Sequence, residues 1–249
     1  MLRKLMTITC LLVASGLLHA PPAMAGGWAV VTLDELPHGA VAREPLTVGF
    51  MIRQHGQTAW VYDDVKVRAF NNHAGQSLIV LARPEGVAGH YVATLTFPAA
   101  GSWNWSIASG LWPDNQPMPV LEVRESRAAP LPVVVWTGDI RLGVTRQAAR
   151  LGLTPADVNP SRQGQELFLA KGCIVCHTHR AIAEQRQGFD DMQIGPNLTH
   201  LSADSDFLHR WLKDPSAIKP GTYMPTLGLS DSEIDSLVAF LLPAAADQR

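Results

Sequence analysis

Residues 173–177 read Cys-Ile-Val-Cys-His, and this stretch decides how the last third of the chain folds. Two cysteines two residues apart, followed directly by a histidine, are the attachment pattern of c-type haem. In such a site Cys173 and Cys176 add to the two vinyl groups of the porphyrin as thioethers, and His177 is the proximal ligand of the iron. Two other sites share the Cys-x-x-Cys spacing. A redox dithiol is expected in a strand-then-helix unit and a structural zinc site needs a second ligand pair, and neither context surrounds residue 173.

Helical periodicity flanks this motif on both sides. A helix capped by Asn159, with proline at its first position, is predicted to run to about Ala170. Apolar residues at helical spacing predict a second helix over residues 205–213. A third is predicted over residues 230–243, where Ser-x-x-Glu at 230–233 forms a capping box. Three short helices supply too little core for this region unless something fills its middle, as one covalently attached haem c would.

Residues 160–243 resemble a class I cytochrome c domain, a likeness that covers about a third of the chain. It rests on Gly164 and Phe168 in the first helix and on Leu237 and Phe240 in the last, at the spacing where this family crosses its terminal helices. A glycine at such a crossing lets the two backbones approach closely. The resemblance implies an all-α domain over residues 159–249.

A second likeness to the family lies in Gly195-Pro-Asn-Leu198, which resembles the loop whose proline carbonyl accepts the N–H of the proximal histidine. Here the pair is Pro196 and His177. Such a bond fixes the orientation of the imidazole ring and raises its basicity as a ligand.

The resemblance also implies a sixth ligand of the iron from the chain beyond the second helix. Met224 lies there in the proline-bounded loop Pro220-Gly-Thr-Tyr-Met-Pro225. A thioether is a soft donor that raises the potential relative to a second histidine. Met224 is therefore the preferred ligand, and the competing candidates are Met192, His179, His200 and His209.

Two aromatic residues complete the expected haem environment. By resemblance, the indole N–H of Trp211 lies near a haem propionate, and Tyr223 lies beside the axial ligand. Ordinary core packing explains both residues equally well from the sequence, because Trp211 falls on the apolar face of its helix.

The first half of the chain has a different period. Apolar residues alternate with polar ones over 46–52, 65–69, 91–97 and 103–107, with turn residues between these segments. Short alternating strands of this kind predict an antiparallel, immunoglobulin-like sandwich. We place it at residues 26–124 and treat residues 125–158 as a linker. The predicted fold class is thus an all-β sandwich followed by an all-α cytochrome c fold.

The stretches Phe50-Met-Ile-Arg-Gln-His-Gly56 and Gly89-His-Tyr-Val-Ala-Thr-Leu95 give the sandwich a faint resemblance to the YtkA/FixH-like domains of exported respiratory and metal-handling proteins. Imidazole and thioether groups suit copper. A copper site is therefore an alternative role for this region, and a docking or spacing module is the preferred one. The candidate copper ligands are Met51, His55, His73 and His90.

The N-terminus has the pattern of a secretory signal peptide over residues 1–25. Arg3 and Lys4 precede an apolar run from Leu5 to Leu18, and the small-residue site Ala-Met-Ala at 23–25 follows. The apolar run is shorter than the roughly 20 residues that a spanning helix needs. We expect an exported protein, in the periplasm or on the outer face of the cytoplasmic membrane.

The composition of the chain limits the kinds of partner that we expect it to bind. The full chain of 249 residues carries 20 basic and 22 acidic side chains, so it offers no basic stripe for nucleic acid. We expect an electron-transfer protein whose partners are redox proteins, including a membrane-bound oxidase or dehydrogenase, with no small-molecule substrate and no catalytic residues. The alternatives are a peroxidase-like haem enzyme, which needs an open iron position, and a copper-handling protein.

Overall fold

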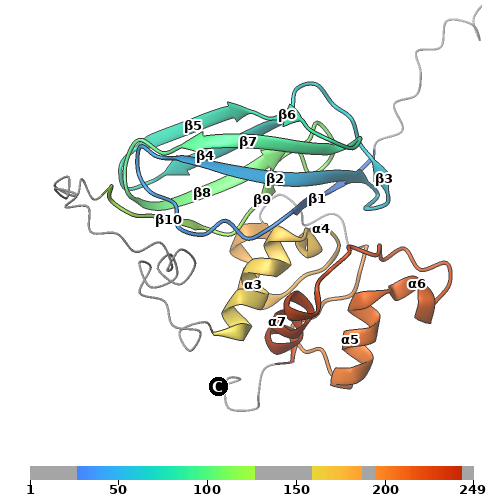
Figure 1. The fold of residues 1–249 in the computed structure, drawn as a ribbon. Coiled ribbons are helices and arrows are strands. Elements are labelled where there is room, and N and C mark those ends of the chain that lie inside the picture. Colours follow the sequence, from blue (N-terminus) through green and yellow to red (C-terminus); the bar gives the residue numbers. More distant parts are fainter. Residues whose placement is uncertain (1–26, 127–158, 187–193, 243–249) are drawn as a thin grey trace, which may run out of the picture.

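The structure is a computed structural model that describes residues 27–126, 159–186 and 194–242. The first of these ranges forms a β-sandwich that lies on a group of helices formed by the other two (Figure 1). This arrangement confirms the predicted fold class. The expected signal peptide and nearly all of the expected linker lie outside the described residues. Across the described parts of the chain, none of the helices has the length and apolar character needed to cross a membrane.

Two antiparallel sheets make up the sandwich. One has the strand order β1-β2-β7-β6, with β3 paired to β2, and the other has the order β10-β8-β4-β5, with β9 paired to β8. The strands are β1 (Ala29–Leu33), β2 (Pro45–Gln54), β3 (Thr58–Ala59), β4 (Lys66–Asn71), β5 (Gln76–Leu81), β6 (Arg83–Pro84), β7 (His90–Thr96), β8 (Gly101–Ala108), β9 (Gln116–Pro117) and β10 (Leu121–Val123).

The alternating segments of the sequence supply the core between the sheets. Phe50 on β2 lies opposite Tyr91 on β7 in the strand register, and their rings stack with centroids 6.0 Å apart. Phe97 and Trp103 form a second ring pair at 5.1 Å. All four side chains are fully buried. Alternation thus predicts this core correctly, because one face of each strand meets the facing sheet and the other meets solvent.

Strand β1 breaks the alternation, and the period of the sequence does not predict it. All five of its residues are buried. Ala29, Val31 and Leu33 belong to the sandwich core, whereas Val30 packs with the apolar residues of the helical region. Because both faces of β1 are covered, its sequence does not alternate regularly, and its one polar residue, Thr32, is buried as well.

The described part of the helical region contains three longer helices, two single α-helical turns and two 3₁₀ turns. The α-helices are α3 (Pro160–Ala170), α4 (Cys173–Cys176), α5 (Ser205–Lys213), α6 (Pro215–Ile218) and α7 (Asp231–Leu241), and the 3₁₀ turns are η2 (Arg180–Ile182) and η3 (Glu184–Arg186). The predicted caps are present: the side chain of Asn159 accepts from the backbone at the start of α3, and Ser230 and Glu233 form a complete capping box on α7.

Helices α3 and α7 cross at Gly164. A Cβ atom at this position would lie 2.0 Å from the backbone oxygen of Ser236, so only glycine allows the approach. The rings of Phe168 and Phe240 meet edge to face beside the crossing, with centroids 5.7 Å apart. The expected contact between the first and last helices is therefore confirmed.

Candidate haem site

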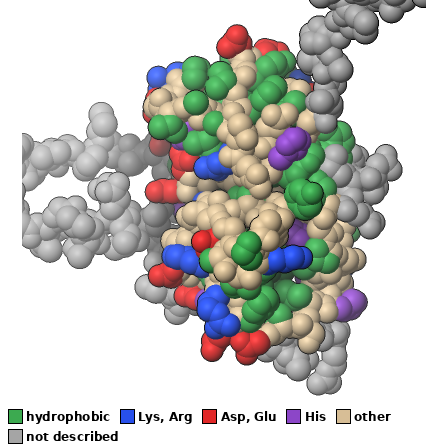
Figure 2. Space-filling model, turned by 90° about the vertical axis from the view of Figure 1, so that its right-hand side faces the viewer, with side chains coloured by type: hydrophobic (Ala, Val, Ile, Leu, Met, Phe, Trp, Pro, Cys, Tyr) green, Lys and Arg blue, Asp and Glu red, His purple; other side chains and the backbone are tan. Residues whose placement is uncertain are grey.

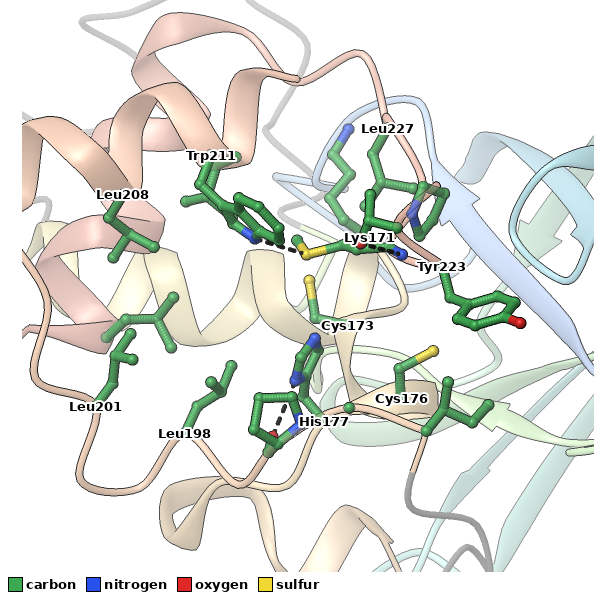
Figure 3. Close-up of a pocket in the computed structure, with 18 of the residues that line it drawn as sticks. Lys171, Cys173, Cys176, His177, Leu198, Leu201, Leu208, Trp211, Tyr223 and Leu227 are labelled. Atoms are coloured by element: carbon green, nitrogen blue, oxygen red, sulfur yellow. Dashed lines mark hydrogen bonds between the residues drawn. The ribbon is translucent and has the colours of Figure 1, made fainter. Parts of the chain in front are cut away.

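An apolar cavity of about 560 Å³ lies in the helical region, next to Val30 on strand β1 of the sandwich. Its walls come from α4, from the loop that begins at Ile194, from α5 and from the loop around Met224. The volume falls in the range of cavities that hold a small organic ligand. Figure 3 shows the side chains that enter it, with Cys173 and His177 below the indole of Trp211.

The two cysteines lie on α4, a single helical turn. Its N-cap, Gly172, has a left-handed backbone with φ of 73°. Both thiols are free, and burial raises the pKa of Cys173 to about 12 and that of Cys176 to about 11. Reactive dithiols have lowered thiol pKa values, because the thiolate is the nucleophile. These half-buried thiols, with their raised pKa values, are a poor match for a redox dithiol.

His177 follows α4 in an extended conformation and is fixed by the loop across from it. Its Nδ1–H donates to the carbonyl of Pro196 at 2.9 Å, the contact expected from the sequence. This bond leaves Nε2 available as a ligand. Burial lowers the pKa of His177, which favours the neutral ring that a metal needs. Gly195 packs so closely that an added Cβ would lie 2.5 Å from Cε1 of this ring.

A buried arginine also fixes α4 and the residue that follows it, His177. Arg186 is 4% exposed, and its guanidinium donates to the carbonyl of Ile174 and, at 3.0 Å, to that of His177. A charged donor to backbone carbonyls holds the turn more firmly than a neutral one. The sequence offers no signal for this role, because Arg186 lies nine positions after His177, at the end of a 3₁₀ turn (Glu184–Arg186).

Met224 lines the cavity from the loop after α6. Its sulfur accepts a hydrogen bond of 3.0 Å from the indole N–H of Trp211, drawn as a dashed line in Figure 3. Trp211 thus faces the cavity as expected, and its N–H is directed at the thioether of Met224. The expected contact with a haem propionate stays a prediction.

The three competing histidines lie away from the cavity. His179, His200 and His209 are not among the residues that line the cavity. His179 packs its ring on Phe240 at 4.4 Å, and His209 is bonded to Ser205 and Asp235. Met192 lies outside the described residues.

Tyr223 borders the cavity, but its side chain is 83% exposed. Figure 3 shows its ring directed away from Trp211. Tyr223 therefore lies at the rim of the cavity and is not a core residue.

Of the copper candidates of the sandwich, Met51 on β2 lies opposite His90 on β7 in the strand register. Within the part of the chain that the structure describes, no three His, Cys, Asp or Glu side chains gather closely enough to hold a metal ion. His90 already bonds Asp34 and the carbonyl of Glu85. His55 packs its ring against Trp28 at 5.3 Å, and His73 lies in the turn between β4 and β5.

Comparison with known proteins identifies the helical region. Residues 161–244 match the cytochrome c family. This cytochrome c domain occupies about a third of the chain and supports an electron-transfer role with haem c. The resemblance of the sandwich to YtkA/FixH-like domains stays a prediction.

Two curated relatives are similar over part of the chain. The first is "Cytochrome c oxidase subunit 2" of Bacillus subtilis (strain 168), 31% identical over 106 residues, which are 38% of this chain and 29% of the relative. The second, of the same name, is from Alkalihalophilus pseudofirmus (strain ATCC BAA-2126 / JCM 17055 / OF4), 27% identical over 86 residues, or 32% and 25% of the two chains. This chain therefore spans less than a third of each relative.

Among solved structures, "Crystal structure of the Lin-41 filamin domain" matches with 12% identity and a TM-score of 0.30. The match covers 39% of this chain and 91% of that one, and the likeness is too slight to establish a shared fold.

Proposed function

We propose that the protein is an exported electron carrier with one haem c, attached through Cys173 and Cys176, with His177 and Met224 as axial ligands. The observation that carries the proposal is that both thiols and the imidazole reach one apolar cavity from α4 and its C-cap, while the thioether reaches it from the loop after α6. When bound, haem c supplies a one-electron couple between ferric and ferrous iron.

The residues present fit this group. The thiols are free and neutral, His177 has one nitrogen committed to Pro196 and the other available, and the thioether comes from a different wall of the cavity. The remaining lining is mainly apolar, which suits a porphyrin and keeps water from the metal. A structural zinc site is a poor match, since no cluster of three ligands is found across the described ranges.

An electron carrier fits better than a haem enzyme. With His177 and Met224 both holding the iron, no iron position would stay open for a substrate. We propose that the redox partner is a protein that docks at the rim of the cavity, where Ile194 and Tyr223 are exposed. The names of the two curated relatives support a membrane-bound oxidase as that partner or as a larger assembly that includes this chain.

Charge has a small part in this docking. Residues 160–249 carry 8 basic against 11 acidic side chains, a net charge of −3. On the face shown in Figure 2, Lys and Arg are interspersed with Asp and Glu and do not gather into one basic patch. A strong charge-steered encounter needs a field of a single sign. The rate of electron exchange should therefore fall only mildly as salt rises.

The experiment that tests the proposal is the intact mass of the denatured protein, purified from a host that attaches haem to exported proteins. We expect the mass of the chain after removal of residues 1–25 plus one haem. A mass without haem, or one that loses haem on acid-acetone extraction, would contradict covalent attachment.

Stopped-flow mixing with a redox protein at several salt concentrations then tests the role. Fast, reversible one-electron exchange with little salt dependence is expected, together with negligible peroxide turnover. Saturable peroxide consumption by the native protein would favour the haem enzyme instead.

A further inference from the structure

The sandwich contacts the candidate haem site at two places. One lies beside α4, the attachment turn that carries Cys173 and Cys176, and the other lies beside the loop around Met224. We infer that the sandwich is a structural wall of the haem cavity and that its β2–β3 turn holds the Met224 loop in position. This inference rests on the proposed haem site and gives the first region a role in it. Strand β1, Lys171 and the turn at Gly56 make the contacts that join the two regions.

Strand β1 provides the wall. Val30 is 3% exposed, lines the cavity and packs with the apolar residues of the helical region. The neighbouring Val31 is fixed by Gln116, whose side-chain amide accepts from the Val31 N–H at 2.8 Å and donates to its carbonyl at 2.7 Å. This amide pair satisfies the backbone of β1 on its unpaired edge, so Val30 is held in place by the sandwich itself.

The same strand lies directly against the attachment turn. At Gly172, which precedes Cys173, an added Cβ would lie 2.4 Å from Cγ1 of Val30 and 2.8 Å from the carbonyl oxygen of Val31. Gly172 also has a φ of +73°, a conformation that side chains disfavour. Close approach and backbone conformation therefore both require glycine where β1 meets α4.

Lys171 fastens this contact. Its residue is 7% exposed, and its Nζ donates to the carbonyls of Leu33 at 2.9 Å and Asp34 at 3.1 Å. The same Nζ lies 2.8 Å from Glu233, the residue that closes the capping box of α7. One buried ammonium thus joins the end of β1, the end of α3 and the start of α7. A buried charge of this kind persists only where its bonds are satisfied.

The turn between β2 and β3 reaches the other side of the site. Gly56 has a φ of +71°, and an added Cβ would lie 2.7 Å from Cγ of Pro225. Pro225 directly follows Met224. The turn is itself fixed by His55, whose backbone N–H donates to the carbonyl of Trp28 at 2.8 Å. Pro225 therefore rests against the β2–β3 turn of the sandwich, and Met224 lies between this contact and Trp211.

A variant pair separates the contact from simple backbone strain. Gly56→Ala and Gly75→Ala both place a side chain at positive φ, +71° and +61°. Only the first substitution brings a methyl group against Pro225, because nothing lies within 4 Å of a Cβ at residue 75. Displacing Pro225 should raise the population in which the Met224 thioether is off the iron. An external ligand binds more tightly in proportion to that population.

The probe is imidazole, titrated into the ferric protein and followed by loss of the sulfur-to-iron charge-transfer absorption. We expect Gly56→Ala to bind imidazole about tenfold more tightly than the native protein, and Gly75→Ala to bind as the native protein does. The double variant Gly56→Ala/Pro225→Ala should move back toward the native affinity, because the second change removes the ring that the added methyl group meets.

A second pair is available if Gly56→Ala does not fold. Val30→Ala shortens the wall without adding bulk and should also tighten imidazole binding, whereas Val87→Ala, on an exposed loop, should not. Equal affinities within both pairs would overturn the inference. Absence of bound haem or of the charge-transfer absorption in the native protein would instead overturn the proposed haem site.

Discussion

The sandwich and the helical region differ in what fills their interiors. Between its sheets the sandwich buries large side chains that fill its own interior, including Trp103, Tyr91, Phe50 and Phe97. The helical region buries Phe168, Leu167 and Ile174, yet α4, α5 and the loops that follow them surround a cavity of about 560 Å³. Protein interiors otherwise contain few voids larger than a water molecule.

Because of this difference, we expect the two regions to be stabilised in different ways. Unfilled apolar cavities destabilise a fold in proportion to their volume. The sandwich therefore owes its stability to its own side chains, whereas the helical region requires the group that occupies its middle. Strand β1 is the exception, because it belongs to the first region and faces the cavity of the second.

The largest effect that separates the regions is expected from removing both attachment points. The double variant Cys173→Ala/Cys176→Ala should lose the bound haem and with it the cooperative packing of the helices, since the filler of their core is gone. The near-ultraviolet circular dichroism of the buried sandwich tryptophans should persist while far-ultraviolet helical signal falls. A haem-free variant with native helical signal and a sharp melting transition would break the comparison.

Truncating a core side chain of the sandwich should destabilise the sandwich and leave the haem site unchanged. Trp103→Ala empties the space beside Phe97 and should lower the free energy of unfolding of the sandwich by about 3–5 kcal/mol. Urea unfolding followed by tryptophan fluorescence measures this loss. Under conditions where the variant stays folded, its haem spectrum should match that of the native protein. A changed axial-ligand spectrum would show that the core of the sandwich, and not only β1, controls the haem site.

Changing the distal ligand should alter the site without unfolding either region. Met224→Ala should abolish the charge-transfer absorption of the ferric protein and lower its midpoint potential, because a thioether ligand favours ferrous iron. Spectroelectrochemical titration gives both quantities. Met192→Ala is the matched control and should change neither. If it removes the absorption instead, the ligand assignment is wrong.

The smallest expected effect is a pH dependence within the sandwich. The hydrogen bond from His90 to Asp34, 2.9 Å long, raises the pKa of His90 above its usual 6.5, against the effect of partial burial. The folded state thus binds this proton more tightly than the unfolded state. The resulting stability is complete below about pH 6.5 and is lost as pH rises through the higher folded value.

His90→Gln should remove this pH dependence from the unfolding free energy of the sandwich. The exposed pair contributes less than about 1 kcal/mol. Urea unfolding at pH 5.5 and 8.5 measures the change. An unchanged pH profile in the variant would show that other groups carry the linkage.

Local patterns in the sequence were sufficient for the helices and for most of the sandwich. The bounds of α3 and α5 and the capping box of α7 follow from spacing and cap residues over a few positions. The bond between His177 and Pro196 was expected because the family resemblance supplied both partners.

The junction between the two regions could not be predicted in the same way. Val30 lies in an apolar run without alternation, and Lys171 is bonded to carbonyls that are 137 and 138 positions away in the chain. Backbone carbonyls carry no side-chain signature, so no pattern in the sequence marks such a contact. Gly56 and Gly172 look like ordinary turn residues in the sequence, and only the structure shows what lies against them.

Hydrogen exchange of the full chain, measured by mass spectrometry with and without attached haem, tests most directly whether only the helical region depends on that group. We predict that loss of haem exposes the amides of residues 160–170 and 231–241 to rapid exchange, while those of β2, β4, β7 and β8 keep their native protection. Equal loss of protection in both regions, or unchanged protection of α3 and α7 without haem, would contradict the account.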